Sequence, residues 1–192
     1  MNTTRLEAFS DGVIAILITI MVLELKIPHG TTLEALSPQL PVFLTYLLSF
    51  VYVGIYWNNH HHMFHVVEEV TGGVLWANLN LLFWMSLIPF ATGWMGENHF
   101  APLPTALYGC VLLAAAIAYR ILVVVICRHP GAGARLSRAL GSDFKGKVSI
   151  VCYIIGIGGA FIHQWISDAL YIGVAAMWLI PDRRIETELK RT

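Results

Sequence analysis

The 192-residue sequence is poor in charge, since Lys, Arg, Asp and Glu together make up 12% of it. Ordinary soluble domains carry about twice that fraction. Cysteine is also scarce, and the three residues present, Cys110, Cys127 and Cys152, all lie in apolar runs. An odd number in such settings is typical of small packed side chains rather than of disulfides or a metal site. These shortages argue against a charged soluble surface and against a disulfide-stabilised scaffold.

Motifs of catalysis and of well-known ion filters are missing as well. The sequence has no Thr-Val-Gly-Tyr-Gly filter, no arginine ladder, no phosphate-binding loop, no nucleophile elbow and no His-Glu-x-x-His motif. Deep carboxylates are absent from the apolar segments, which weakens the case for proton-coupled transport. We therefore expect no enzyme activity, no resident cofactor, no metal and no nucleic-acid partner.

Apolar residues, by contrast, are abundant and come in long blocks. Hydrophobic residues make up 57% of the sequence, and the mean hydropathy is +0.67. A helix of about 20 apolar residues spans the hydrocarbon of a bilayer. The segments of suitable length are Phe9–Ile27, Pro41–Trp57, Val74–Trp94, Pro102–Ile126, Val148–Trp165 and Ser167–Ile180. The sequence therefore predicts an all-α membrane protein, with residues 1–192 forming a single domain of six transmembrane helices.

The distribution of basic residues decides between six spans and five. The last two segments are nearly continuous and are separated only by a turn predicted at 163–168, so one long helix there would leave five spans. With six spans, one side of the membrane receives Arg5, Arg128, Arg135, Arg138, Lys145, Lys147, Arg183, Arg184, Lys190 and Arg191. The positive-inside rule makes that side cytoplasmic. We predict six spans, both termini in the cytoplasm, a cytoplasmic loop at about 128–147 and a cytoplasmic tail at 181–192.

The first span has a periodic pattern that suggests two alternative roles. At 3.6 residues per turn, one stripe of the helix holds Arg5, Ala8, Gly12, Ile16, Thr19 and Leu23. Asp11 points about 100° away from Gly12, towards the flank of this stripe. The stripe either lines a pore or packs against lipid and other helices, and periodicity alone favours packing. In a pore, Gly12 would leave the entrance wide, and the larger side chains would form successive rings.

Four histidines lie at the end of the second span, at His60, His61, His62 and His65. One interpretation is a metal site, because two of them are four residues apart on a helix. We favour a structural interpretation, because no cysteine or third aligned carboxylate is evident. In that interpretation, one histidine or Trp57 reaches a buried polar partner such as Asp11 or Ser10.

The third span carries polar residues and a proline within an apolar sequence, at Asn78, Asn80, Ser86 and Pro89. Asparagine in a membrane helix usually bonds to a neighbouring helix. The proline predicts a local kink or loss of hydrogen bonding. Arg120, in the fourth span, is close enough to the cytoplasmic side to extend its guanidinium there. We expect structural roles for these residues.

These residues together resemble the signature of the transmembrane protein 175 family of potassium channels. The first helix opens with Arg5-x-x-x-Phe9-Ser10-Asp11. The second ends with Trp57-x-x-His60 and Phe64, and the third has Asn78 eleven residues before Pro89. Six spans with both ends cytoplasmic are similar to one repeat of that family. The resemblance therefore covers nearly the whole chain.

The resemblance implies a potassium-permeable, modestly potassium-selective cation channel without a re-entrant pore loop, in the plasma membrane of a prokaryote. A single repeat resembles the prokaryotic form, which is a homotetramer. The first helix of each subunit would line the pore, with hydrophobic rings as filter or gate, at Gly12, Ile16, Thr19 and Leu23. A polar network around the signature would comprise Arg5, Phe9, Ser10, Asp11, Trp57, His60 and Asn78. The expected partners are other copies of the chain, the bilayer and permeant K+ or other monovalent cations.

Two other functions stay open at this point. The first is a proton- or cation-coupled secondary transporter that uses Asp11 and His60. The second is a membrane scaffold without permeation. Saturable, coupled flux would indicate the transporter, whereas flux that follows the driving force would indicate the channel.

Overall fold

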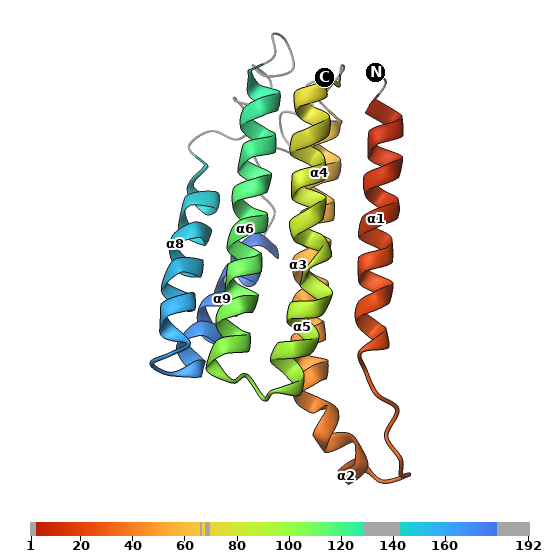
Figure 1. Cartoon of the computed structure of the whole chain (residues 1–192), viewed down its shortest axis with the longest axis vertical. Coiled ribbons are helices and arrows are strands. Elements are labelled where there is room, and N and C mark those ends of the chain that lie inside the picture. The colour runs from red at the N-terminus through yellow and green to blue at the C-terminus, as the bar shows by residue number, and fades with distance from the viewer. Residues whose placement is uncertain (1–2, 66, 68–69, 129–142, 180–192) are drawn as a thin grey trace.

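The computed structural model describes residues 3–65, 67, 70–128 and 143–179, and every regular element in these ranges is helical. The chain order, shown in Figure 1, is α1 (Thr3–Leu23), α2 (Leu33–Leu36), the 3₁₀ turn η1 (Ser37–Gln39), α3 (Leu40–Phe64), α4 (Gly72–Ser86), α5 (Ile88–Glu97), α6 (Pro102–Cys127), α8 (Phe144–Gly159) and α9 (Gln164–Leu179).

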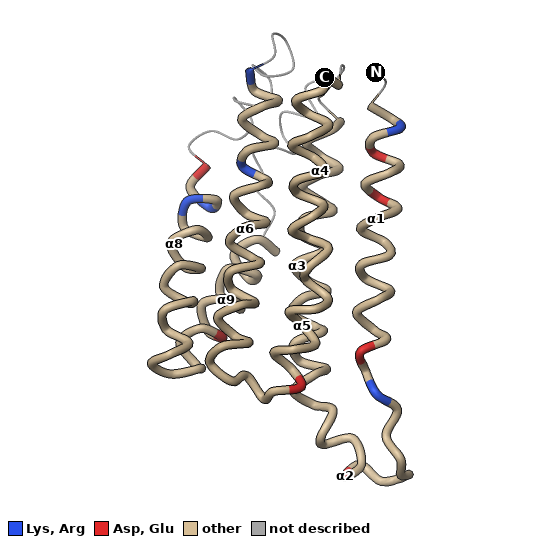
Figure 2. The backbone as a smooth tube through the Cα atoms, in the orientation of Figure 1, with Lys and Arg blue, Asp and Glu red and all other residues tan. Residues whose placement is uncertain are grey.

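The helices form a bundle of antiparallel neighbours. α6 packs against α4, α5, α8 and α9, whereas α1 packs against α3, α4 and α5. α1 therefore lies at one edge of the bundle and α8 at the other (Figure 1). α1 and α4 begin, and α3 and α6 end, at the same end of the bundle, which we call the N-terminal end. Charged residues gather towards the two ends, and the middle carries none in the part drawn in Figure 2.

Within the described residues, four helical segments are long and apolar enough to cross a bilayer: Thr3–Leu23, Leu33–Phe64, Gly72–Glu97 and Pro102–Cys127. The fifth and sixth predicted spans correspond to α8 and α9, which have 16 residues each. At 1.5 Å per residue, such a helix is about 24 Å long, and the hydrocarbon is about 30 Å thick. Each of the six predicted spans thus coincides with helical structure, but the last two are short for a full crossing.

Several predicted boundaries were displaced. The turn expected at 163–168 instead occupies 160–163, because α8 ends at Gly159 and α9 already begins at Gln164. The hydroxyl of Ser167 donates to the carbonyl of Gly156 at 2.6 Å, which ties the first turn of α9 to α8. The cytoplasmic loop expected at 128–147 ends earlier too, since residues 144–147 form the first turn of α8. Residues 129–142 of that loop and the tail at 181–192 lie outside the described residues.

The third predicted span is interrupted near its proline. α4 ends at Ser86, and α5 begins at Ile88 with Pro89 in its first turn. Proline has no N–H group to bond to the preceding turn, so a new helix start costs little at this position. The second span, in turn, continues beyond Trp57 through the histidine run to Phe64.

Tyrosines dominate the interior between α3, α6, α8 and α9. Tyr52 donates to the carbonyl of Tyr171 at 2.6 Å, and Tyr171 donates to the carbonyl of Thr105 at 3.3 Å. The hydroxyl of Tyr108 lies 2.9 Å from that of Ser49. Buried tyrosines normally need such partners for their hydroxyls. Close packing accompanies these bonds, because a Cβ atom added at Gly109 would lie 2.0 Å from the Tyr171 hydroxyl.

Candidate functional site

α1 presents one face to the bundle and leaves the opposite face without cover from its own chain. The buried residues recur every three or four positions, at Leu6, Ser10, Ile14, Leu17 and Met21. The stripe predicted to line a pore points the other way: Ile16 is 56% exposed and Leu23 is 78% exposed. Gly12 and Thr19 are exposed as well. Within one chain, the predicted stripe is therefore an uncovered surface.

The shape and chemistry of this stripe vary along α1. A Cβ atom added at Gly12 would meet nothing within 4 Å. The hydroxyl of Thr19 donates to the carbonyl of Ile16 at 2.9 Å. Because that bond uses the only hydroxyl proton, the lone pairs of the Thr19 oxygen remain available as acceptors. The stripe thus has one side-chain hydroxyl oxygen, between the apolar side chains of Ile16 and Leu23.

A chain of hydrogen bonds joins the buried face of α1 to α4 and α3. Ser10 donates to the carbonyl of Leu6 at 2.8 Å, and the Asn78 amide donates to the Ser10 oxygen at 2.9 Å. The amide oxygen of Asn78 lies 2.8 Å from Nε2 of His60. An amide oxygen can only accept, so Nε2 of His60 must carry the proton of this bond. All three side chains are at most 1% exposed.

A second contact joins the flank of α1 to α3. The indole N–H of Trp57 donates to Oδ1 of Asp11 at 3.0 Å. The Trp57 ring is stacked with His61, with ring centroids 6.0 Å apart. Asp11 thus lies beside the stripe and binds a neighbouring helix. The two contacts together fix the rotation of α1 about its own axis.

Two members of the predicted polar network lie outside these contacts. Arg5 is exposed and forms no hydrogen bond or ion pair within the described part of the chain. Phe9 is 52% exposed. Within one chain, the structure therefore brings together Ser10, Asn78 and His60, and separately Asp11 and Trp57. A role of Arg5 and Phe9 in the network stays a prediction.

The histidine run offers two imidazoles close together, at His61 and His65, whose ring centroids are 4.6 Å apart. Among the described residues, no group of three or more His, Cys, Asp or Glu side chains is placed to hold a metal ion. A stable metal site normally needs at least three protein ligands. The geometry of these residues therefore gives no support to the metal interpretation.

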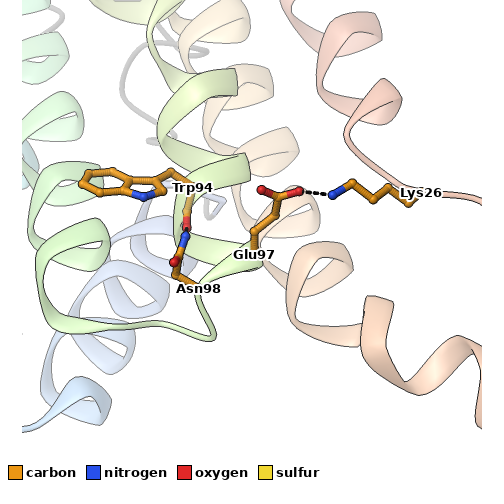
Figure 3. A network of polar contacts seen from close by, with 4 residues as sticks. All are labelled: Lys26, Trp94, Glu97 and Asn98. Atoms are coloured by element: carbon orange, nitrogen blue, oxygen red, sulfur yellow. Dashed lines mark hydrogen bonds and ion pairs between the residues drawn. The ribbon is translucent and has the colours of Figure 1, made fainter.

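Sequence reasoning missed a contact at the opposite end of the bundle. Lys26, just beyond α1, forms an ion pair with Glu97 at the end of α5, as Figure 3 shows. Asn98 donates to the carbonyl of Trp94 at 2.8 Å and closes the same end of α5. The carboxylate of Glu97 raises the pKa of Lys26 above its ordinary value, through a hydrogen bond and charge attraction. The only signal in the sequence was one isolated lysine on a side otherwise free of basic residues.

A shallow pocket adjoins this ion pair. Its volume is about 350 Å³, and its lining includes Glu24, Lys26, Gln39, Glu97 and His99. Glu24 also lies close to α5, since a Cβ atom added at Gly93 would be 3.3 Å from its carboxylate. The end of α1 is thus held against α5 by one charged pair and one close approach.

The described residues form a helical bundle in which four segments are apolar and long enough to cross a bilayer, and the first of them has an uncovered apolar face. These features define a multi-span membrane protein. A family model described as "Endosomal/lysosomal potassium channel TMEM175" matches residues 5–89. This range includes all but the first two residues of α1, the whole of α3 and α4, and the side-chain contacts described above between these helices. The match therefore falls on the part of the chain that carries the candidate site.

Relatives extend the likeness to the whole chain. A potassium channel of Chryseobacterium sp. (strain P1-3) is 56% identical over 99% of this chain and 99% of its own length. The endosomal/lysosomal proton channel TMEM175 of Homo sapiens is 34% identical over 47% of this chain and 20% of its own. The crystal structure of a lysosomal potassium-selective channel TMEM175 homolog from Chamaesiphon minutus superimposes with a TM-score of 0.76, at 27% identity, over 93% of this chain and 96% of that one. The chain belongs to the TMEM175 family of channels and is not an enzyme.

Proposed function

We propose that this protein is a potassium-permeable, modestly potassium-selective cation channel of a prokaryotic plasma membrane. Four copies of the chain assemble, and α1 of each copy lines a central pore. The observation that carries the proposal is the division of α1 into a buried face and an uncovered apolar stripe. The names of the bacterial relatives support potassium as the permeant ion.

Ile16 and Leu23 form two hydrophobic rings in this assembly. An aliphatic ring has no ligands to replace the hydration shell of an ion. An ion must therefore pass with its water or meet a barrier where the pore dewets. Such a ring acts as a filter or a gate, depending on its diameter. The exposed positions of both side chains, on one stripe of α1, support this role.

Thr19 supplies the polar ring between the two hydrophobic ones. Its hydroxyl proton is directed back to the carbonyl of Ile16. The oxygen can therefore accept from water or bind a cation directly, and four such oxygens would surround the pore axis. We assign the modest preference for potassium to this ring. Gly12, which has no side chain, leaves the entrance at the N-terminal end wide.

The buried contacts of α1 hold the stripe towards the pore axis. Any rotation of α1 would break the bonds from Asn78 to Ser10 and from Trp57 to Asp11. One hydrogen bond between membrane helices contributes about 1 kcal/mol. The pair of contacts is thus strong enough to favour one orientation and weak enough to permit movement during gating.

The coupled transporter that uses Asp11 and His60 is the alternative. Proton coupling needs titratable groups that face the transport path. His60 is 1% exposed and bonded to Asn78, on the side of α1 away from the stripe. Asp11 binds Trp57. Both groups are therefore committed to helix contacts, which favours the channel.

A flux assay tests the proposal. The purified chain is reconstituted into potassium-loaded liposomes, and potassium efflux is followed with an impermeant counter-ion and a proton carrier. We expect efflux that rises in proportion to the driving force and does not saturate. Replacement of Ile16 or Leu23 by Ala should change the efflux rate, whereas the same replacement of Ile172 of α9, which is as exposed as Ile16, should not. Saturable efflux that requires a proton gradient would instead establish the transporter.

A further inference from the structure

Asp168 is the only charged residue of α9 and lies on the buried side of this helix, in its second turn. It is 9% exposed, and no hydrogen bond or ion pair joins its carboxyl group to any other residue that the structure describes. Buried carboxylates are normally paired or hydrogen-bonded, because an isolated charge is costly away from water. The carboxyl group of Asp168 therefore lacks the partner that its burial requires.

A second buried polar group without a partner belongs to the first turn of α6. Thr105 is fully buried, and its hydroxyl has no hydrogen bond within the described ranges. Tyr171 connects the two positions. Its hydroxyl donates to the Thr105 carbonyl at 3.3 Å and is near enough to Asp168 for the two to interact by charge. Both groups without partners thus adjoin the same contact between α6 and α9.

Packed side chains surround this contact. A Cβ atom added at Gly156 of α8 would lie 2.5 Å from the Tyr171 ring, so the helices leave little space there. The turn that precedes α9 is apolar where it is exposed, since Phe161, Ile162 and Trp165 are each more than 60% exposed. Such side chains contact lipid rather than water in a membrane protein. Asp168 therefore lies between a closely packed interior and an apolar edge.

The titratable groups around the contact carry no positive charge. The helices packed against α9 are α3, α6 and α8. The titratable side chains that they place against Tyr171 are Tyr52, Tyr108, Cys110 and Tyr153, which are neutral at pH 7. In the turn before α9, Nδ1 of His163 accepts from a backbone N–H group at 3.4 Å, so this imidazole is neutral too.

The basic residues of α6 and α8 lie towards the opposite end of the bundle, as Figure 2 shows. Arg120 is fifteen residues further along α6 than Thr105, or about 22 Å, and it is paired with Asp143. The ranges 129–142 and 180–192, which are not described, also continue from helix ends at that opposite end. Among the described residues, no cation thus offsets an ionised Asp168.

The chemistry of the two groups favours a proton over a metal cation as the ligand. A metal cation needs more oxygen ligands than one carboxyl group and one hydroxyl provide. No group of three or more His, Cys, Asp or Glu side chains in the described ranges is placed to hold one. One proton, by contrast, removes the charge of the carboxylate and gives it a hydrogen-bond donor.

We propose that Asp168, at the contact between Tyr171 and Thr105, is a proton-binding site between α6 and α9. The carboxyl group is neutral while the chain is folded at neutral pH, and it adds a donor to an interface that contains the free hydroxyl oxygen of Thr105. When the proton leaves, a charge without a partner remains between the helices, so α9 is held less tightly. The site does not depend on the proposed pore, because α1 packs against α3, α4 and α5 instead.

Infrared spectroscopy of the full chain in detergent tests the protonation directly. A neutral carboxyl group has a C=O stretching band that a carboxylate lacks. The wild type at pH 7 should show a carboxylic band that shifts in D2O and is absent from Asp168→Asn. The control is Glu34→Gln, which changes an exposed acid of α2 and should keep the band. Identical carboxylic bands in the wild type and Asp168→Asn would overturn the proposal.

The pH dependence of unfolding gives a second readout. Asparagine resembles the neutral carboxyl group, so the equilibrium constant for unfolding of the wild type is compared with that of Asp168→Asn between about pH 5 and pH 8. An unfolded aspartate loses its proton near about pH 3.9, whereas the folded chain retains it. The ratio of the two constants should therefore rise with pH, by about tenfold per pH unit until the folded carboxyl group also ionises. Glu34→Gln should keep the slope of the wild type.

Two results would contradict the site. A ratio that is constant over this pH range would show that the folded and unfolded chains bind the proton equally. Stabilisation of the wild type, but not of Asp168→Asn, by potassium or sodium at constant ionic strength would identify a metal cation as the ligand instead.

Discussion

α1 and the tyrosine-lined interior between α3, α6, α8 and α9 differ in how completely their side chains are covered by the chain itself. In the interior, Tyr52, Tyr108 and Tyr171 are at most 2% exposed. Tyr52 and Tyr171 donate to backbone carbonyls, and the hydroxyl of Tyr108 bonds to that of Ser49. α1 encloses one face only and leaves Ile16 and Leu23 uncovered. The first region is complete within a single chain. The second is complete only when something else, which we propose to be the other subunits and the ion path, occupies its outer face.

Two glycines, one in each region, show the same difference in packing. Gly109 of α6 has the Tyr171 hydroxyl and a side-chain carbon of Ile157 where its Cβ atom would be. Gly12 of α1 has nothing within 4 Å of that position. One glycine permits close packing, and the other leaves space open. The same substitution at both positions therefore tests whether a residue belongs to the packed interior or to the uncovered stripe of α1.

The largest expected effect is that of Gly109→Ala. The added carbon would lie 2.0 Å from the Tyr171 hydroxyl, so the ring must move and its bond to Thr105 is lost. Overpacking of this kind costs about 1–3 kcal/mol, and we expect the upper part of that range. The measurement is the free energy of unfolding in detergent.

Gly12→Ala is the matched control for that prediction. Alanine favours a helix over glycine, so the stability should stay unchanged or rise slightly. Potassium flux should fall, because the entrance narrows. Equal destabilisation by the two variants would contradict the distinction between the two regions.

The hydrogen bonds that join α1 to α4 and α3 should give the second-largest effect on stability. Asn78→Ala leaves the Nε2 proton of His60 without its acceptor and removes the donor to Ser10. A buried donor without a partner costs about 1–3 kcal/mol. Thermal unfolding in detergent should show the loss. Asn80→Ala, two residues further along α4, is the control and should change the stability by less than about 0.5 kcal/mol. If both asparagine variants melted alike, the hydrogen-bond chain would not hold α1.

The smallest effect should come from the ion pair between Lys26 and Glu97. Both side chains are well exposed, and exposed pairs contribute little. Because the pKa of Lys26 is raised in the folded protein, the contribution is fully present at neutral pH and is lost only as the pH rises beyond 10.5. Lys26→Gln should therefore cause a small decrease in melting temperature at pH 7, which disappears in high salt. A decrease that persisted in high salt would point to packing instead.

The sequence predicted the periodic features well. Helical phase separated Gly12, Ile16, Thr19 and Leu23 from Asp11, and the structure leaves the first four exposed while Asp11 bonds to Trp57. The interruption near Pro89 was predictable because proline removes a specific backbone bond. These features depend only on residue spacing and on local backbone chemistry.

Tertiary contacts decided the features that the sequence missed. The turn before α9 depends on the bond from Ser167 to Gly156. The buried hydroxyls of Ser49, Thr92 and Tyr108 meet from three different helices. No local pattern indicates such partners. The start of α8 was misplaced for a similar reason, because the pairing of Asp143 with Arg120 joins positions 23 residues apart.

The most direct test of the account compares two isoleucines that are both 56% exposed in one chain, Ile16 of α1 and Ile172 of α9. The measurement is the reversal potential in planar bilayers, with potassium on one side and sodium on the other. Ile16→Asn should polarise a ring of the pore and raise sodium permeability relative to potassium, whereas Ile172→Asn should leave the reversal potential at the wild-type value. An unchanged reversal potential in Ile16→Asn, or an equal shift in both variants, would contradict the central claim that the uncovered stripe of α1 lines the ion path.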